Sequence, residues 1–165
     1  MSPARAMTKA RARIMVACAA GAGVLATGTG AGATDTAAPS SGSAVTITVT
    51  DLRNSKGVVM ACMTTQEDIF PRCRRDPNSH RATVQAGETV TIRFEDVKPG
   101  EYAIALLHDE NEDGKANRML GMAPREGYGF SRDAPVQMAP PNWDDAVFTH
   151  GDEAQSLTIT MRYFL

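Results

Sequence analysis

Hydrophobic and polar residues alternate with a period of two along much of the chain. Val45, Ile47 and Val49 alternate with threonines, and the same alternation recurs over residues 89–94 and 155–165. This period is typical of strands with one buried face, and the β-branched side chains favour the same conformation. The pattern therefore predicts strands near the beginning, the middle and the end of one domain.

Two further segments, 57–63 and 102–107, are hydrophobic at nearly every position. Such segments are typical of strands at the centre of a sheet. Shorter hydrophobic stretches at 82–84 and 146–150 add two more candidates, and no amphipathic helix is evident. We therefore expect six to eight strands in an all-β fold, a single antiparallel β-sandwich.

The segments between the expected strands are rich in turn-forming residues. Residues 97–100, Val-Lys-Pro-Gly, predict a type II turn with a positive φ at Gly100. A long loop-rich region spans residues 108–144 and contains four glycines and four prolines. This region is where we expect the special chemistry of the chain.

The N-terminus has the pattern of an export signal. Basic residues precede an apolar stretch at 14–26, and Ala31-Gly32-Ala33 is a small-residue cleavage site. The apolar stretch is too short for a membrane-spanning helix, which needs about 20 residues. We expect a secretory signal peptide over 1–33 and a periplasmic or secreted protein. Acylation of Cys18, as in a lipoprotein, is the weaker alternative.

Cleavage after Ala33 changes the composition of the chain that remains. Residues 34–44 are small and polar and predict a flexible lead to a domain over 45–165. The formal charge moves from −2 to −6, because the four charged residues removed are all basic. An acidic domain is a poor match for nucleic acid.

Two cysteines, Cys62 and Cys73, follow the predicted leader. In an exported protein this pair favours a disulfide bond. A zinc site that combines both cysteines with His80 is the alternative.

The segment between these cysteines and the next strand carries four arginines. They are Arg72, Arg74, Arg75 and Arg81. A solvated loop explains them, and so does contact with an anionic surface such as envelope phosphates.

The sharpest chemical motif is D-x-N-x-D-G, formed by Asp109, Asn111, Asp113 and the glycine that follows. Oxygen ligands at alternate positions before a glycine begin a calcium loop, and Asn117 extends the candidate set. An EF-hand would need Glu at position 120, which is Leu, so a different cation site or a metal-free turn is expected. Glu126 is a more distant candidate carboxylate.

His108 directly precedes this motif. A histidine at a strand end can form hydrogen bonds, ligate a metal or act in a hydrolase with Asp109 or Glu126. No nucleophile motif accompanies it, so we expect no catalysis, and the hydrolase is kept as an alternative.

Three aromatic residues complete the candidate chemistry. Tyr128 and Phe130 alternate with glycines, and Trp143 follows two prolines. They predict either packing at one end of the domain or a ligand platform, as in a carbohydrate-binding module.

Four motifs in this order resemble the uncharacterised bacterial family called domain of unknown function 2141. They are Phe94-x-x-Val97-x-Pro99-Gly100-x-Tyr102, HDENEDGK at 108–115, Gly121-x-x-x-x-Glu126-Gly127-Tyr128-Gly129-Phe130-Ser131, and Pro140-Pro141-x-Trp143-x-Asp145-Ala146-x-Phe148. The resemblance covers roughly residues 45–165, and members of the family usually have Asp at the position of Asn117. The first motif also resembles a turn of transthyretin-like sandwiches, so the resemblance implies an immunoglobulin-like or transthyretin-like fold. It implies no defined activity. The expected export and the dense loop at 108–131 favour a cell-envelope binding or structural module.

Overall fold

The structure, a computed structural model, describes residues 42–119, 123–136 and 139–164. The predicted signal peptide, Cys18 and most of the predicted lead lie outside these residues. The first strand begins at Ser43, two residues before the expected start of the domain. Among the described residues, no helix has the length and hydrophobicity needed to cross a membrane.

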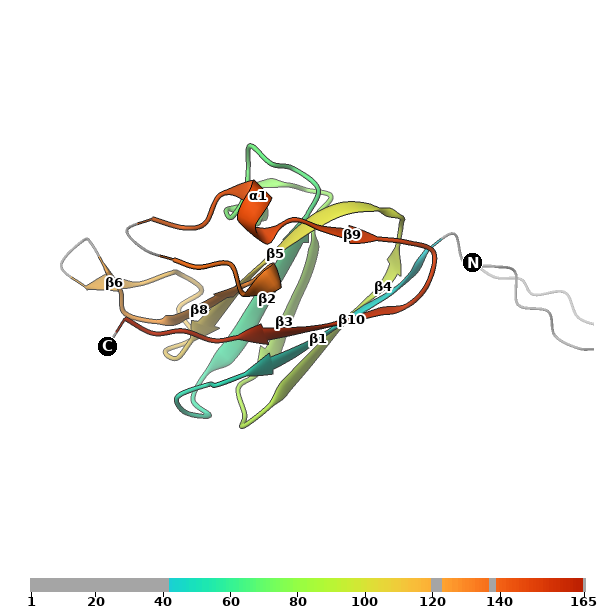
Figure 1. Cartoon of the computed structure of the whole chain (residues 1–165). Helices are drawn as coiled ribbons and strands as arrows, with labels where there is room; N and C mark the ends of the chain where they lie inside the picture. The colour runs from blue at the N-terminus through green and yellow to red at the C-terminus, as the bar shows by residue number, and fades with distance from the viewer. Residues whose placement is uncertain (1–41, 120–122, 137–138, 165) are drawn as a thin grey trace, which may run out of the picture. The chain divides into compact units, whose positions relative to one another are not determined.

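The first sheet has three strands in the order β10-β1-β4 (Figure 1). They are β1 (Ser43–Thr50), β4 (Val90–Val97) and β10 (Gln155–Thr160). β1 is antiparallel to β4 but parallel to β10. The expectation of a wholly antiparallel fold is therefore wrong for this pair, because alternation determines which face is buried and not the direction of a strand.

The second sheet has five strands in the order β3-β2-β5-β8, with β9 pairing to the start of β5. They are β2 (Val58–Thr64), β3 (His80–Gln85), β5 (Gly100–Asp109), β8 (Gly127–Phe130) and β9 (Phe148–His150). The two segments that are hydrophobic throughout became β2 and β5. Both are central, as predicted.

Short elements fill the remaining loops. They are a two-stranded hairpin of β6 (Arg118–Met119) and β7 (Ala123–Pro124), the 3-10 turns η1 (Cys73–Arg75) and η2 (Ser131–Asp133), and the four-residue helix α1 (Trp143–Ala146). The strand expected over 146–150 is thus shorter, because Ala146 ends α1 and the strand begins at Phe148.

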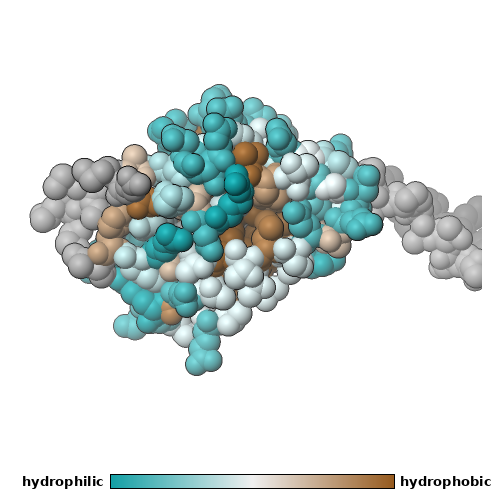
Figure 2. Space-filling model, viewed as in Figure 1, coloured by the Kyte–Doolittle hydropathy of each residue, from teal (hydrophilic) through white to brown (hydrophobic). Residues whose placement is uncertain are grey.

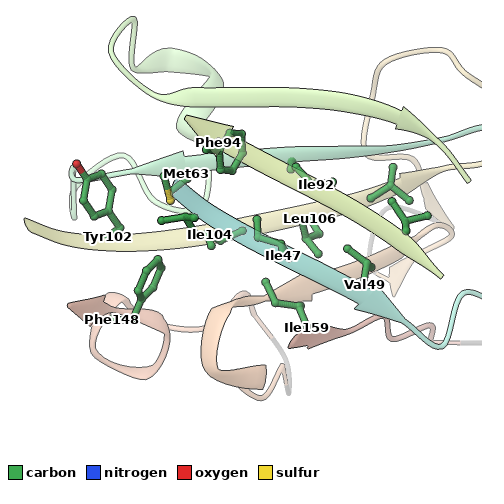
Figure 3. Packing of buried hydrophobic residues seen from close by; sticks show 14 of the residues in the cluster. Ile47, Val49, Met63, Ile92, Phe94, Tyr102, Ile104, Leu106, Phe148 and Ile159 are labelled. Atoms are coloured by element: carbon green, nitrogen blue, oxygen red, sulfur yellow. The ribbon is translucent and has the colours of Figure 1, made fainter. Parts of the chain in front are cut away.

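The inner faces of the two sheets share one hydrophobic core (Figure 3). Register places Ile47 between Ile92 and Leu157 in the first sheet, and Ile104 and Leu106 come from β5 of the second. Each fully buried aliphatic side chain of this kind stabilises the fold by about 1.5–3 kcal/mol. The described chain is therefore an all-β protein with two sheets around a common core.

The connection from β4 to β5 differs from the predicted turn. Asp96 has a positive φ of 54°, whereas Gly100 does not. Gly100 is already paired with His150 in the sheet, so its backbone is extended. Asp tolerates the left-handed conformation better than most residues because its short side chain is polar. Asp96 lies within β4, beside the register shift in its pairing with β1.

The outer faces of the two sheets differ in polarity. On the first sheet the outward positions of β1 are Thr46, Thr48 and Thr50. On the second sheet the outward positions include Met60 and Leu107, which are paired across β2 and β5. A second hydrophobic cluster, centred on Ala103, Phe130, Ala134 and Ala146, covers part of this face.

Part of the protein surface is hydrophobic. Figure 2 shows hydrophobic residues gathered in a strip at the middle of one face, with hydrophilic residues around it. Of the large hydrophobic side chains described, Phe164 is the exposed one, at 37%.

Candidate functional site

Three carboxylates converge where β5 ends and β8 begins. Asp109 is the last residue of β5, and Glu126 immediately precedes β8. The antiparallel register pairs His108 with Gly127. Asp109, which follows His108, and Glu126, which precedes Gly127, therefore lie at the same end of the sheet. Asp113 belongs to the turn that leaves β5. One ligand oxygen from each of the three side chains lies within 4.8 Å of the other two.

The hairpin of β6 and β7 explains how Glu126 reaches the loop. Arg118 pairs with Pro124, and the Arg125 amide donates to the Asn117 carbonyl at 2.9 Å. This pairing brings the chain after β7 back beside the residues that precede β6, so that Glu126 lies next to Asn117. The distant candidate carboxylate of the sequence is therefore a near neighbour in space.

Asp109 has an unusual environment for an acidic side chain. It is 0% exposed, and its Oδ2 accepts a hydrogen bond from the Gly114 amide at 2.7 Å. Its Oδ1 has no hydrogen-bond partner, and it is the one buried side-chain oxygen or nitrogen without a partner among the described residues. A buried carboxylate oxygen is costly unless a donor or a cation satisfies it.

Asn117 joins the other two carboxylates. Its side-chain amide donates to Asp113 Oδ2 at 2.8 Å and to Glu126 Oε1 at 3.4 Å, and its backbone amide donates to Glu126 Oε2 at 3.0 Å. Asn111 lies farther out and donates to Asp113 Oδ2 at 3.1 Å. The predicted residues are thus brought together, with Asn117 and Asn111 bound to the carboxylates by hydrogen bonds.

The carboxylates have different electrostatic surroundings. Burial raises the pKa of Glu126 above its usual range, and the charges of Asp109 and Asp113 raise it further. The hydrogen bond from Asn117 is the main cause of a lowered pKa at Asp113. Asp113 therefore holds its negative charge more readily, whereas Glu126 is harder to ionise.

Glu110, which follows Asp109, is held away from this cluster. Arg53 donates to both of its carboxylate oxygens at 2.6 Å, and Asn54 donates at 2.8 Å. The hydrogen bond from Arg53 is the largest reason that the pKa of Glu110 falls to about 2. Glu110 is therefore a fixed partner of Arg53 and not a member of the cluster.

Gly57 allows the close approach of the neighbouring strand. It has a φ of 69°, and a Cβ atom at this position would lie 2.1 Å from the carbonyl oxygen of Asp109. Only glycine fits there without a shift of the backbone. The loop before β2 thus supports the position of Asp109.

His108 occupies the opposite face of β5, inside the core. Its Nε2 donates to the Lys56 carbonyl at 2.8 Å, and its Nδ1 is 2.6 Å from the Tyr163 hydroxyl. Both nitrogens therefore have partners, and strand alternation directs the ring away from Asp109. The structure does not assemble the pair of His108 and a carboxylate that the hydrolase alternative requires.

The three candidate platform residues lie in the second hydrophobic cluster. Phe130 is 8% exposed, and its ring is inclined to that of Tyr128 by 43°. Trp143 meets the ring of Phe70 edge-on, at 81°. These rings do not form one flat surface, so the arrangement gives little support to the carbohydrate-binding alternative, which stays a prediction.

The predicted disulfide joins Cys62 of β2 to Cys73 of η1, with the Cα atoms 6.0 Å apart. Because the two sulfurs bind one another, they are not available as thiolate ligands, and the zinc alternative with His80 is wrong. The bond holds Arg72, Arg74 and Arg75, the neighbours of Cys73, beside the second sheet.

The residues that sequence reasoning missed lie on the outer face of that sheet. The uniform hydrophobicity around Met60 and Leu107 predicts central strands and does not distinguish a covered outer face from an open one. The sequence does contain a signal for this face. A strand that is hydrophobic throughout has an apolar outer face, which is either covered by other residues or available for binding.

The cluster of Asp109, Asp113 and Glu126 offers only oxygen ligands. Such sets favour hard cations, Ca²⁺ above all when the ligands come from a loop. The structure supplies three carboxylates, one with an unsatisfied buried oxygen.

Comparison with known proteins gives a family but no closer relative. Residues 47–158 match the family described as "Uncharacterized protein conserved in bacteria (DUF2141)". Neither the curated proteins nor the solved structures gave a match. The match covers more than half of the chain, which therefore belongs to this uncharacterised bacterial family.

Proposed function

We propose that this protein is an exported, non-catalytic β-sandwich of the cell envelope that binds Ca²⁺ through Asp109, Asp113 and Glu126. The observation that carries the proposal is the buried Oδ1 of Asp109, which has no hydrogen-bond partner and belongs to a cluster of three carboxylates within 4.8 Å. A divalent cation would satisfy this oxygen and offset the repulsion among the three side chains.

The finer parts of the proposal rest on separate observations. The two sheets around one core support an immunoglobulin-like or transthyretin-like sandwich. The basic and apolar pattern of residues 1–33 supports export to the periplasm or beyond. Extracellular Ca²⁺ sites commonly bind with dissociation constants of about 10⁻⁴–10⁻³ M, which suits a structural cation in an exported domain.

Thermal unfolding of the purified protein with EDTA, Ca²⁺ or Mg²⁺ tests the cation site. A ligand that binds only the folded state stabilises it by about 2.7 kcal/mol at 100 times its dissociation constant. We expect Ca²⁺ to raise the unfolding midpoint by several degrees and Mg²⁺ to raise it less. An unchanged midpoint across millimolar Ca²⁺ would refute the proposal.

The variant Asp109→Asn separates the cation site from general stability. In EDTA it should be more stable than the wild type by about 1 kcal/mol, because it removes an unsatisfied buried charge, and it should lose the response to Ca²⁺. Asp152→Asn, at an exposed position, is the matched control and should keep that response. Equal Ca²⁺ responses in both variants would remove Asp109 from the site.

A further inference from the structure

The outer face of the five-stranded sheet carries a groove of about 1000 Å³. Its lining includes the segment that contains Phe70 and η1, and residues 139–141 together with Phe164. This volume lies at the upper end of the range for sites that hold one small molecule, about 300–1,000 Å³. It is distinct from the carboxylate cluster, although Asn117 borders both.

The floor of the groove is a row of side chains fixed by strand register. Met60 of β2 pairs with Leu107 of β5, and Leu107 pairs with Tyr128 of β8. The neighbouring row contains Cys62, Ala105 and Phe130. Side chains in one row of a sheet lie on the same face, so the floor is continuous and apolar. A contiguous apolar patch on the outer face of a sheet is more often a binding surface than a surface left in contact with water.

The rim near η1 is strongly basic. Arg72, Arg74, Arg75 and Arg81 all border the groove and are exposed. In the part of the chain that is described, the arginines within salt-bridge distance of a carboxylate are Arg53 and Arg93, and none of these four is among them.

One disulfide and three hydrogen bonds hold this rim in place. The disulfide attaches Cys73 to the floor residue Cys62. Arg81 donates to the carbonyls of Arg74 at 3.0 Å and Asp76 at 2.6 Å, and Arg74 donates to the carbonyl of Gly114. Arg72 and Arg75 are left with guanidinium groups that can meet a ligand.

We propose that this groove binds a fatty acid, with the alkyl chain on the apolar floor and the carboxylate at Arg72 and Arg75. Burial of alkyl groups contributes about 0.8 kcal/mol per CH₂, and guanidinium groups bind carboxylates through paired hydrogen bonds. A wholly polar ligand would leave the apolar floor hydrated. A cationic amphiphile would be repelled by the four arginines.

Titration of the full protein with laurate, in EDTA and below the micelle-forming concentration, tests this site. Trp143 is the single tryptophan of the chain, and its ring contacts that of Phe70 at a centroid distance of 5.9 Å. We therefore expect a saturable change in its emission, matched by a one-site calorimetric isotherm. Dodecyltrimethylammonium, with the same chain and a positive head, should produce neither.

Variants assign the two parts of the ligand. Arg72→Gln combined with Arg75→Gln should raise the laurate dissociation constant about tenfold, as expected for the loss of charged hydrogen bonds. Leu107→Gln should raise it as well, and Arg93→Gln, on the other sheet, should leave it unchanged. The use of EDTA makes the result independent of the cation site.

Three binding results would overturn the inference. They are the absence of saturable laurate binding by both readouts, an unchanged affinity in the double arginine variant, and equal binding of laurate and the cationic amphiphile. A dimer in sedimentation velocity that Leu107→Gln dissociates would also overturn it, because a second copy of the chain would then cover the floor.

Discussion

Asp109 occupies a poor environment for a negative charge. It is fully buried, one oxygen has no donor, and two other carboxylates lie close by. Leaving a buried polar group unsatisfied costs about 1–3 kcal/mol, so a protein that keeps such a residue gains something from it elsewhere. The proposed cation would provide that gain, and the neighbouring Asn117 offers a way to test it.

Replacing Asn117 by Asp should strengthen cation binding and weaken the cation-free fold. The change removes the amide that donates to Asp113 and Glu126 and adds a fourth negative charge. In EDTA we expect a loss of about 1–2 kcal/mol in the free energy of unfolding. With Ca²⁺, affinity should rise because the ligand charge increases. Urea unfolding in both conditions measures both effects, and a variant less stable in EDTA with unchanged Ca²⁺ affinity would show that Asn117 lies outside the site.

His80 should make folding stability depend on pH. Burial lowers the pKa of its imidazole, which packs against Phe94 and Tyr102. The unfolded chain, with an ordinary pKa of about 6.5, binds the proton more readily, so stability falls as pH decreases through 6.5. His80→Phe should gain stability relative to the wild type as pH falls from 7.5 to 5.5. Parallel stability curves for the two proteins across that interval would contradict this prediction.

At the scale of elements, the disulfide and the β6–β7 hairpin hold the loops against the second sheet. The motif around Asp109 and Asp113 was predictable from sequence, because its residues are close together in the chain. The arrival of Glu126 was not, because it depends on the register between β5 and β8 and on the return of the hairpin. The disulfide was predictable from cysteine count and expected export, but its effect on the arginines was not.

Replacing both Cys62 and Cys73 by Ala should destabilise the fold and loosen the arginine rim. The bond closes a loop with a sequence separation of 11, for which the chain-entropy estimate is about 3 kcal/mol. Urea unfolding measures this loss, and laurate titration of the folded variant should show weaker binding. The Ca²⁺ response should persist, since none of the three carboxylates is bonded to either cysteine. An unchanged laurate affinity would show that the disulfide does not position the arginines.

At the scale of the whole molecule, the two sheets differ in what their outer faces do. The alternation in β1 and β4 predicted a solvated outer face, and this is what the threonines provide. The uniform hydrophobicity of β2 and β5 predicted central strands but not an open groove beside them. The parallel pairing of β1 with β10 was likewise beyond the sequence pattern, since those strands are far apart in the chain.

The acidic loop and the basic loop also meet in the folded protein. Arg74, beside the disulfide, donates a hydrogen bond to the carbonyl of Gly114 in the loop that carries Asp113. The carboxylate cluster and the arginine rim are therefore neighbours on one sheet. A cation that orders the acidic loop would act next to the groove. The cation site is therefore the central proposal for this protein.

A calorimetric titration of the purified protein with CaCl₂ tests that claim most directly. We expect one saturable site per chain, with a dissociation constant between about 10⁻⁴ and 10⁻³ M, and no saturable heat for Asp109→Asn. Absence of saturable heat from the wild type up to millimolar Ca²⁺, or an identical isotherm from Asp109→Asn, would contradict it.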